Sequence, residues 1–283
     1  MLKIAVSDEL QISKDIETHL SHSGLSIDFR DRSKSIFYSD RFPSEIRYLD
    51  NNHVFISIAN GLYDLAIVND LSLCEQEKDY EKLYVFEEAS SSLCFFFANG
   101  VKYKDVLSLS NKRIATNVPE TVKRYCKSKR IRGTTIIFDK TPQNAVELGI
   151  ADCFVDLAKN TDSKQYYMAE VIMETHLVLI ASPKISLEKR HIFVDELIYR
   201  LQAVQNARNK IKVEILCSME NKNKLVAEIR KIDENIIVLS SYDQQMVSIQ
   251  AIMDEKQLWD ITHYLKEIKA EKIIVYDITK MII

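Results

Sequence analysis

Hydrophobic and polar positions alternate along residues 1–210 with two periods, one typical of buried strands and one typical of helices. Short apolar runs bounded by polar or small residues predict strands at 2–6, 25–30, 44–49, 63–69, 92–98, 113–116, 135–138, 152–157 and 178–181. Longer segments with an apolar residue every three to four positions predict helices at 13–23, 53–60, 119–127, 144–148 and 187–210. Strands that alternate with helices indicate an α/β domain with a mostly parallel sheet.

Glycine and proline sharpen the ends of these helices. Gly24 and Gly61 each follow a helical segment, and we expect both to end it, because glycine readily adopts the left-handed conformation of a C-cap. Pro119 precedes a helical segment and is expected to begin it, since proline suits the first helical turn.

The pattern changes near residue 210. Beyond that point strands are predicted at 211–217, 236–239, 247–253 and 272–278, with a helix at 223–232 and another that starts after Asp254. Gln257 lies three residues after Asp254, close to a capping box. The order β-α-β-β-α-β is typical of a ferredoxin-like domain, so we expect a second domain from residue 211 to 283.

Composition narrows the class of protein. The chain has 283 residues, 46% of them hydrophobic, with a net charge of −3 and a pI near 6.1, so it offers no bulk attraction to nucleic acid or to an anionic membrane. No apolar run is long enough for a transmembrane helix, and the first residues lack the pattern of a signal peptide. The five cysteines are scattered without a CxxC pair, which predicts neither disulfides nor a zinc site and favours a cytoplasmic protein.

One strand end is the strongest candidate for a binding site. The segment Gly149-Ile-Ala-Asp-Cys-Phe-Val-Asp-Leu157 predicts a buried strand that ends at Asp156, and phosphorylated ligands bind beyond such strand ends in α/β proteins. The next loop, Lys159-Asn-Thr-Asp-Ser-Lys164, has no glycine. With five glycines in all, the chain has neither GxGxxG nor a P-loop, which excludes those two kinds of nucleotide site.

Several segments resemble the long, regulated form of ATP phosphoribosyltransferase, the family that opens histidine biosynthesis. They run in the family's order from end to end: Leu2-Lys-Ile-Ala-Val6, Gly61-Leu-Tyr-Asp-Leu-Ala-Ile67, Ile114-Ala-Thr116 with Pro119, Gly149 to Asp156, Arg200-Leu-Gln-Ala-Val-Gln-Asn-Ala-Arg208, and Ile273-Ile-Val with Ile278-Thr-Lys-Met281. The resemblance implies a bilobal α/β part like that of periplasmic binding proteins, with lobe I at 1–90 and 175–210 and lobe II at 91–174. The ferredoxin-like (βαββαβ) tail would be an ACT-like regulatory domain that binds histidine or another small effector.

The resemblance also implies a reaction. In the family, the adenine N1 of ATP attacks phosphoribosyl pyrophosphate and displaces pyrophosphate from the ribose C1, with Mg²⁺ on the phosphates. Homo-oligomers are usual in the family. The phosphate loop, commonly Asp-x-Val-Ser-x-Gly-x-Thr, matches residues that begin at Asp156, so the substrate-binding candidates are Asp156, Thr161, Asp162 and Ser163. Asp156 either faces the ligand or only caps the turn, and we name no catalytic residue and no metal ligand.

The departures from the family pattern cluster at positions that the resemblance assigns to the reaction site. Glu9-Leu-Gln11 replaces the family's Lys-Gly-Arg, Asp50 replaces an arginine, Lys140-Thr-Pro-Gln143 replaces Gly-x-Val-Glu, and the glycine of the phosphate loop is missing. Charge-assisted contacts to phosphate contribute about 1.5–3 kcal/mol each. Two lost cations and two added carboxylates therefore cost about 6 kcal/mol, which is about four decades of affinity.

These departures leave more than one function open. The sequence predicts a glycosyltransferase of this family with weakened or lost catalysis, a candidate pseudoenzyme. The alternative is a non-catalytic paralogue that binds a small molecule or regulates an active homologue, and a solute-binding protein is a third option. His19 and His22 lie three residues apart on a predicted helix, and without a carboxylate or cysteine at metal spacing we interpret them as solvent-exposed.

Overall fold

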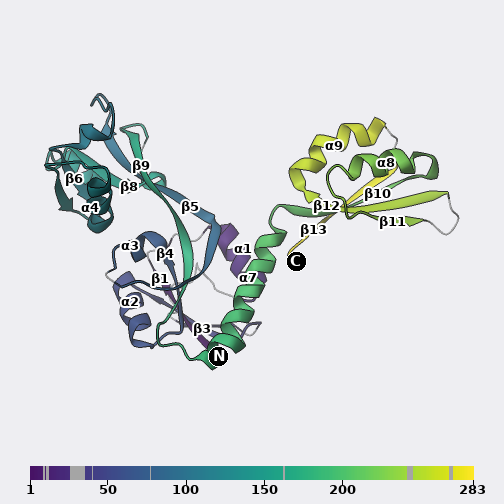
Figure 1. Cartoon of the computed structure of the whole chain (residues 1–283), viewed down its shortest axis with the longest axis horizontal. Coiled ribbons are helices and arrows are strands. Elements are labelled where there is room, and N and C mark those ends of the chain that lie inside the picture. The colour runs from purple at the N-terminus through teal and green to yellow at the C-terminus, as the bar shows by residue number, and fades with distance from the viewer. Residues whose placement is uncertain are drawn as a thin grey trace. The chain divides into compact units, whose positions relative to one another are not determined.

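The computed structural model describes residues 1–8, 10, 13–25, 36–39, 41–76, 78–161, 163–240, 245–267 and 270–283. The chain divides into two compact units, Met1–Ile198 and Tyr199–Ile283 (Figure 1). The predicted boundaries of the two lobes and of the tail stay predictions. The predicted strand at 25–30 falls almost wholly outside the described residues.

The first unit is built on one sheet of nine strands within the described residues, in the order β2-β3-β1-β4-β9-β5-β8-β6-β7. The strands are β1 (Leu2–Ser7), β2 (Ile36–Ser39), β3 (Ser44–Leu49), β4 (Leu65–Asn69), β5 (Lys82–Ala98), β6 (Arg113–Thr116), β7 (Thr135–Phe138), β8 (Cys153–Leu157) and β9 (Tyr166–Ala181).

Two groups of parallel strands stand on either side of an antiparallel centre. β1 pairs in parallel with β3 and β4, and β6 pairs in parallel with β7 and β8. The long strands β5 and β9 run antiparallel to each other and join the groups by pairing with β8 and β4. The prediction of a mostly parallel sheet is confirmed for β1, β3 and β4 and for β6, β7 and β8. It is wrong at the centre and at β2, which pairs antiparallel with β3. We call the group β1–β4 with its helices lobe I and the group β6–β8 with its helices lobe II.

Helices cover both groups of strands. They are α1 (Lys14–Ser23), α2 (Asn51–Asn60), α3 (Asp70–Cys74), α4 (Pro119–Ser128), α5 (Pro142–Glu147), α6 (Leu187–Lys189) and α7 (Asp195–Ala207), with a π-helical turn at Arg190–Val194 between the last two. Gly24 and Gly61 end α1 and α2 with φ of 103° and 74°, as the sequence predicts. The predicted helix at 187–210 is thus a helical run with a π turn inside it, and it ends earlier than predicted, at Ala207, because Lys210 already begins β10.

Apolar side chains on both faces of lobe II bury the sheet between two helices. Val122 and Cys126 of α4 pack with Phe95 on one face, and Ala145 of α5 packs with Phe96 and Phe154 on the other. In lobe I, Val54, Phe55 and Ile58 of α2 pack against β1, β4 and β9. Because successive side chains of a strand point to opposite faces, the run Leu93–Phe97 can supply both cores of lobe II.

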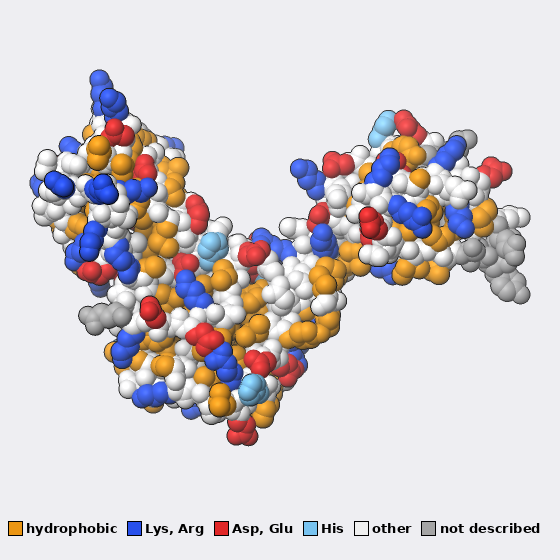
Figure 2. All heavy atoms as spheres, in the orientation of Figure 1, with side chains coloured by type: hydrophobic (Ala, Val, Ile, Leu, Met, Phe, Trp, Pro, Cys, Tyr) orange, Lys and Arg blue, Asp and Glu red, His pale blue; other side chains and the backbone are white. Residues whose placement is uncertain are grey.

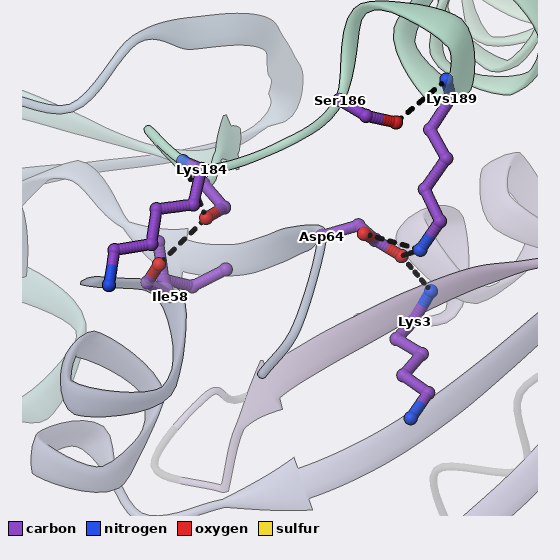
Figure 3. Close-up of polar contacts among 7 residues, drawn as sticks. Lys3, Ile58, Asp64, Lys184, Ser186 and Lys189 are labelled. Atoms are coloured by element: carbon purple, nitrogen blue, oxygen red, sulfur yellow. Dashed lines mark hydrogen bonds and ion pairs between the residues drawn. The ribbon is translucent and has the colours of Figure 1, made fainter. Parts of the chain in front are cut away.

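The motif Gly61-Leu-Tyr-Asp-Leu has a structural role that Figure 3 shows. Asp64 is buried, and its carboxylate accepts the backbone N–H of Lys3 at 2.9 Å and the ammonium of Lys189 at 2.8 and 2.9 Å. Nearby, the Ser182 hydroxyl donates to the carbonyl of Ile58. Asp64 therefore ties the start of β1 to α6 across a separation of more than a hundred positions in the sequence.

The second unit contains β10 (Lys210–Ser218), α8 (Lys222–Ile229), β11 (Ile237–Ser240), β12 (Met246–Asp254), α9 (Glu255–Glu267) and β13 (Lys272–Asp277). Its sheet has the order β11-β12-β10-β13, and its printed pairs are antiparallel. This is the ferredoxin-like arrangement that the sequence predicts. The Asp254 N–H donates to the Gln257 side chain at 2.9 Å, as a capping box requires.

No helix among the described residues is both long and apolar enough to cross a membrane.

The five cysteines are free thiols, and all but Cys74 are buried. Burial raises the pKa of the Cys94 thiol to about 11 and that of Cys153 to about 12, so neither thiol is a nucleophile near neutral pH.

Candidate functional site at the strand ends of lobe II

The candidate site lies where β6, β7 and β8 end. Because these strands are adjacent and parallel, their carboxyl ends meet at one edge of lobe II. Three segments emerge there: Asn117–Val118 before α4, Asp139–Thr141 before α5, and Ala158–Asn160, a short 3-10 helix after β8. The predicted phosphate loop is the last of the three.

Asp156 holds the turn that leaves β8. Its Oδ1 accepts the backbone N–H of Leu157 at 2.6 Å and the side-chain amide of Asn160 at 3.0 Å, and the residue is half-buried. A carboxylate oxygen with two donors already has a structural partner. These hydrogen bonds are those of a turn cap, and a contact of Asp156 with a ligand stays a prediction.

The described loop residues Thr161 and Ser163 differ in their surroundings. The Thr161 N–H donates to the carbonyl of Ala158, and its Oγ1 is buried with no hydrogen-bond partner among the described residues. Ser163 is exposed. Asp162 lies outside the described residues. The structure therefore brings Asp156 and Thr161 to one turn. Among the described residues of this turn, 156–161, the Thr161 hydroxyl is the one buried side-chain polar atom without a hydrogen-bond partner.

Lys140 and Gln143, which the sequence analysis predicts to replace residues of the family's Gly-x-Val-Glu, flank the start of α5. Lys140 is exposed, and the Gln143 amide donates to Glu147 Oε1 at 2.8 Å, along the helix itself. Asp139 accepts the N–H of Thr141 at 2.9 Å and so closes the preceding turn. These polar groups are engaged with their own segment.

Asp50 in lobe I caps a helix. Its carboxylate accepts the backbone N–H of His53 at 3.1 Å and also contacts the His53 ring at Nδ1, so it is the N-cap of α2. The pKa of this carboxyl lies below its ordinary value, chiefly because the His53 N–H donates to it and also because the imidazole does. Glu9 and Gln11, the other altered positions of lobe I, lie outside the described residues.

Positive charge collects elsewhere on lobe II. Figure 2 shows Lys and Arg side chains over the part of the molecule that carries α4 and β6. From residue 112 to 132 the sequence contains one acid, Glu120, against eight cations: Lys112, Arg113, Lys123, Arg124, Lys127, Lys129, Arg130 and Arg132. These lie on α4 and near the amino ends of β6 and β7, away from the turn of Asp156.

A buried polar cluster in lobe I corrects the interpretation of His19. The ring is 4% exposed; its Nδ1 lies 2.5 Å from Glu88 Oε1, and its Nε2 lies 3.3 Å from the hydroxyl of Tyr84. Both partners belong to β5, which the sequence predicted only from residue 92. The histidine is therefore part of the core, and a carboxylate partner that is distant in sequence left no local signal.

Sequence reasoning missed one further polar contact at the candidate edge. Glu75, just after α3, reaches the first turn of α4 with both carboxylate oxygens. No spacing rule connects a glutamate of lobe I with a helix of lobe II.

In the described part of the chain, no group of three or more His, Cys, Asp and Glu side chains is placed to hold a metal ion.

Family models match most of the chain. The model described as ATP phosphoribosyltransferase matches residues 51–203, and the model of the HisG C-terminal domain matches residues 215–280. ATP phosphoribosyltransferases from Bacteroides fragilis and Parabacteroides distasonis are each 26% identical to the chain over 286 aligned positions, and the alignments cover all of both proteins.

A solved structure supports the same fold. The chain is similar to an ATP phosphoribosyl transferase (HisG:HisZ) complex from Thermotoga maritima, with a TM-score of 0.54 and 20% identity. The match covers 71% of this chain and 99% of that one. At this identity the likeness shows the fold alone.

Proposed function

Since this chain belongs to the ATP phosphoribosyltransferase family of histidine biosynthesis, we propose that it keeps the family's bilobal body but binds phosphoribosyl pyrophosphate and ATP weakly, with transferase activity weakened or lost. The lobes would be residues 1–90 with 175–210 and residues 91–174, followed by a regulatory tail at 211–283. The substrate-binding residues that remain would be Asp156, Thr161, Asp162 and Ser163.

One observation carries this proposal: the turn after β8 uses its own donors. The N–H of Leu157 and the amide of Asn160 both point to Asp156, and the N–H of Thr161 points to Ala158. A phosphate held by a loop needs such N–H groups directed at its oxygens. Here a carboxylate already accepts two of the donors, and it repels a second anion.

Lobe I supports the same proposal through Asp50. Its negative charge lies at the start of α2, where a helix favours an anion, and the His53 N–H and ring keep it there. A phosphate that approached this helix end would meet a carboxylate in place of a free N-terminus. Lys159 is the exposed cation nearest in sequence to the turn of Asp156.

The Mg²⁺ of the family reaction would arrive with the substrate. Asp156 is the carboxylate at the candidate turn, but two donors already engage it, and the described residues include no group of three or more His, Cys, Asp and Glu side chains placed to hold a metal ion. These donors do not make a protein-built magnesium site. The ion would therefore neutralise substrate phosphates, and its binding would depend on theirs.

The test compares the wild type with a variant that carries the family's residues. Isothermal titration with phosphoribosyl pyrophosphate and Mg²⁺ measures binding, and the absorbance of phosphoribosyl-ATP measures turnover after ATP is added. We expect the wild type to bind in the millimolar range or weaker. The variant Glu9→Lys, Gln11→Arg, Asp50→Arg and Thr161→Gly should bind about 100-fold more tightly or better, because each restored cation contributes about 1.5–3 kcal/mol.

Asp50→Arg alone is the necessary control, because it removes the cap of α2 as well as the charge. If it lowers thermal stability, the combined variant should be made with and without it. Micromolar binding of phosphoribosyl pyrophosphate by the wild type, with formation of phosphoribosyl-ATP, would overturn the proposal.

A second candidate function is a non-catalytic subunit that assembles with itself or with an active homologue. The open face of the second unit's sheet favours it: Ile237, Leu239 and Ile252 are 55%, 49% and 42% exposed. Mass photometry of the purified chain, alone and with an active homologue, would show either assembly, and titration with histidine would test an effector on the tail. A monomer at micromolar concentration, unchanged by an active homologue, would exclude it.

A further inference from the structure

Two short helices from different lobes cap each other. The carboxylate of Glu75, which follows α3 in lobe I, accepts the backbone N–H of Glu120 at 3.0 Å and that of Thr121 at 2.8 Å. It also accepts the Thr121 hydroxyl at 2.6 Å. In return, the guanidinium of Arg124 on α4 donates to the carbonyl of Cys74, the last residue of α3.

The first turn of α4 depends on this distant carboxylate. Its N-cap is Val118, whose side chain has no acceptor, and Pro119 has no N–H. The free donors of that turn are therefore the N–H groups of Glu120 and Thr121, and Glu75 accepts both. An anion at a helix N-terminus is also favoured by the helix dipole.

Apolar packing places α3 against lobe II as well. Leu71 of α3 is 7% exposed and belongs to the core cluster that contains Phe95, Val122 and Tyr125. On the other side of α3, Asp70 Oδ1 accepts the N–H of His176 in β9. The helix thus belongs in sequence to lobe I and in packing to both lobes.

Among the described residues, the other main connection between the lobes is the pair β5 and β9. That pair has register shifts, including one between Phe86 and Ser91 where it passes from lobe I to lobe II. Irregularities of this kind bend a strand and increase its local twist. The contact of Glu75 with α4 is a second connection between the lobes, away from these two strands.

We propose that Glu75 is a positioning residue that clamps α3 to α4 and so sets the spacing of the two lobes. The clamp holds the carboxyl ends of the lobe I strands at a defined distance from those of lobe II. A ligand that needs a different spacing must break three hydrogen bonds to a carboxylate before it binds. This inference goes beyond the proposed function, because it holds whether or not the chain binds phosphoribosyl pyrophosphate.

The decisive experiment measures the distance between the lobes with no ligand present. Spin labels are attached at Ile56→Cys in α2 and Lys127→Cys in α4, both exposed positions, in a full-length Cys74→Ser background. We expect one narrow distance distribution for the parent. Glu75→Ala should broaden it and shift its mean, and Glu75→Gln should do so less, because the amide keeps one acceptor oxygen.

Hydrogen exchange at the start of α4 provides the second readout. The amides of Glu120 and Thr121 should exchange about tenfold faster in Glu75→Gln and faster still in Glu75→Ala, because each lost bond to a charged acceptor makes local opening easier. Glu120→Gln is the matched control: it removes a carboxylate from the same helical turn but leaves the two N–H groups bound to Glu75.

The two readouts together distinguish a clamp between the lobes from a simple helix cap. A changed distance distribution with faster exchange in the Glu75 variants, and neither change in Glu120→Gln, supports the clamp. Faster exchange with an unchanged distribution overturns it, because Glu75 would then be only a helix cap. Unchanged exchange and distance overturn it as well. Circular dichroism confirms that each variant is folded, and Glu75→Gln preserves the side-chain shape if Glu75→Ala does not fold.

Discussion

The N-terminal ends of α2 and α4 satisfy the same physical need in two different ways. Each presents backbone N–H groups and the positive end of a helix dipole, and each receives a carboxylate. At α2 the acid is Asp50, immediately before the helix. At α4 it is Glu75, which follows a different helix in the other lobe. The first cap forms with its helix, and the second forms only when two lobes meet.

The difference shows that a carboxylate can have a structural role without a ligand. Asp50, which the sequence analysis predicts to replace an arginine of the family, caps α2. A local cap stabilises its own helix and little else. A remote cap also couples the two elements that it joins, so its loss is expected to reach farther than one turn of helix.

The largest effect should follow from removal of the remote cap. Glu75→Ala leaves two backbone N–H groups and one hydroxyl without their acceptor, and water can replace part of what is lost. We expect the free energy of unfolding of the first unit to fall by about 2–3 kcal/mol. Calorimetry of the full chain, in which the two units can give separate transitions, measures it. A loss confined to a few tenths of a kcal/mol would remove the distinction between the two caps.

A double-mutant cycle should sharpen the comparison at α4. Glu75→Ala and Thr121→Val each remove the bond between the carboxylate and the hydroxyl, so their effects on unfolding should not add. We expect a coupling energy of about 1 kcal/mol, the range found for residues in direct contact. Thr121→Val combined with Asp50→Ala is the control, and those two changes should be additive.

The local cap should show a smaller effect that depends on pH. The folded-state pKa of Asp50 is lowered, so its contribution is present above the unfolded value near 3.8 and is lost as the pH falls through the folded pKa. Asp50→Asn should therefore melt below the wild type at pH 7, and the gap should close at an acidic pH below the folded-state pKa of Asp50. Melting curves at both values measure it. An equal gap at the two pH values would contradict the cap.

The smallest effect is expected at Thr161. Its Oγ1 is buried and unpaired among the described residues, so replacing the threonine by the similarly shaped valine removes an unsatisfied group. Thr161→Val should be neutral or more stable by up to about 1 kcal/mol. Thermal melting without ligand checks this, and a clear loss of stability would reveal a partner for the hydroxyl.

Much of the fold follows from local signals. Ser44–Leu49, Arg113–Thr116 and Thr135–Phe138 form strands with the predicted ends, because polar or small residues bound each apolar run. The first strand of the tail could also be predicted, because strict alternation in Ile211–Cys217 indicates a strand with one buried face. Gly24 and Gly61 end helices because both have positive φ.

The long central strands could not be predicted in full. Residues 82–91 carry charges at several positions, and Ala169-Glu-Val-Ile-Met-Glu174 in β9 consists largely of residues that also suit a helix. Pairing with distant strands imposes the extended form on both. At the candidate site, Asp156 and its turn could be located from the strand end, whereas Glu75 could not, because its partners lie in a helix about 45 positions later.

The order of strands in the first sheet constrains how the chain can fold. β4 is complete at Asn69, but its neighbour β9 begins at Tyr166, so one edge of the N-terminal sheet stays open while the intervening residues are synthesised. Such non-local pairing slows folding and leaves an unpaired edge available to other chains. The strands of lobe I therefore gain their last sheet neighbour only when Leu177–Ala181 of β9 has been synthesised.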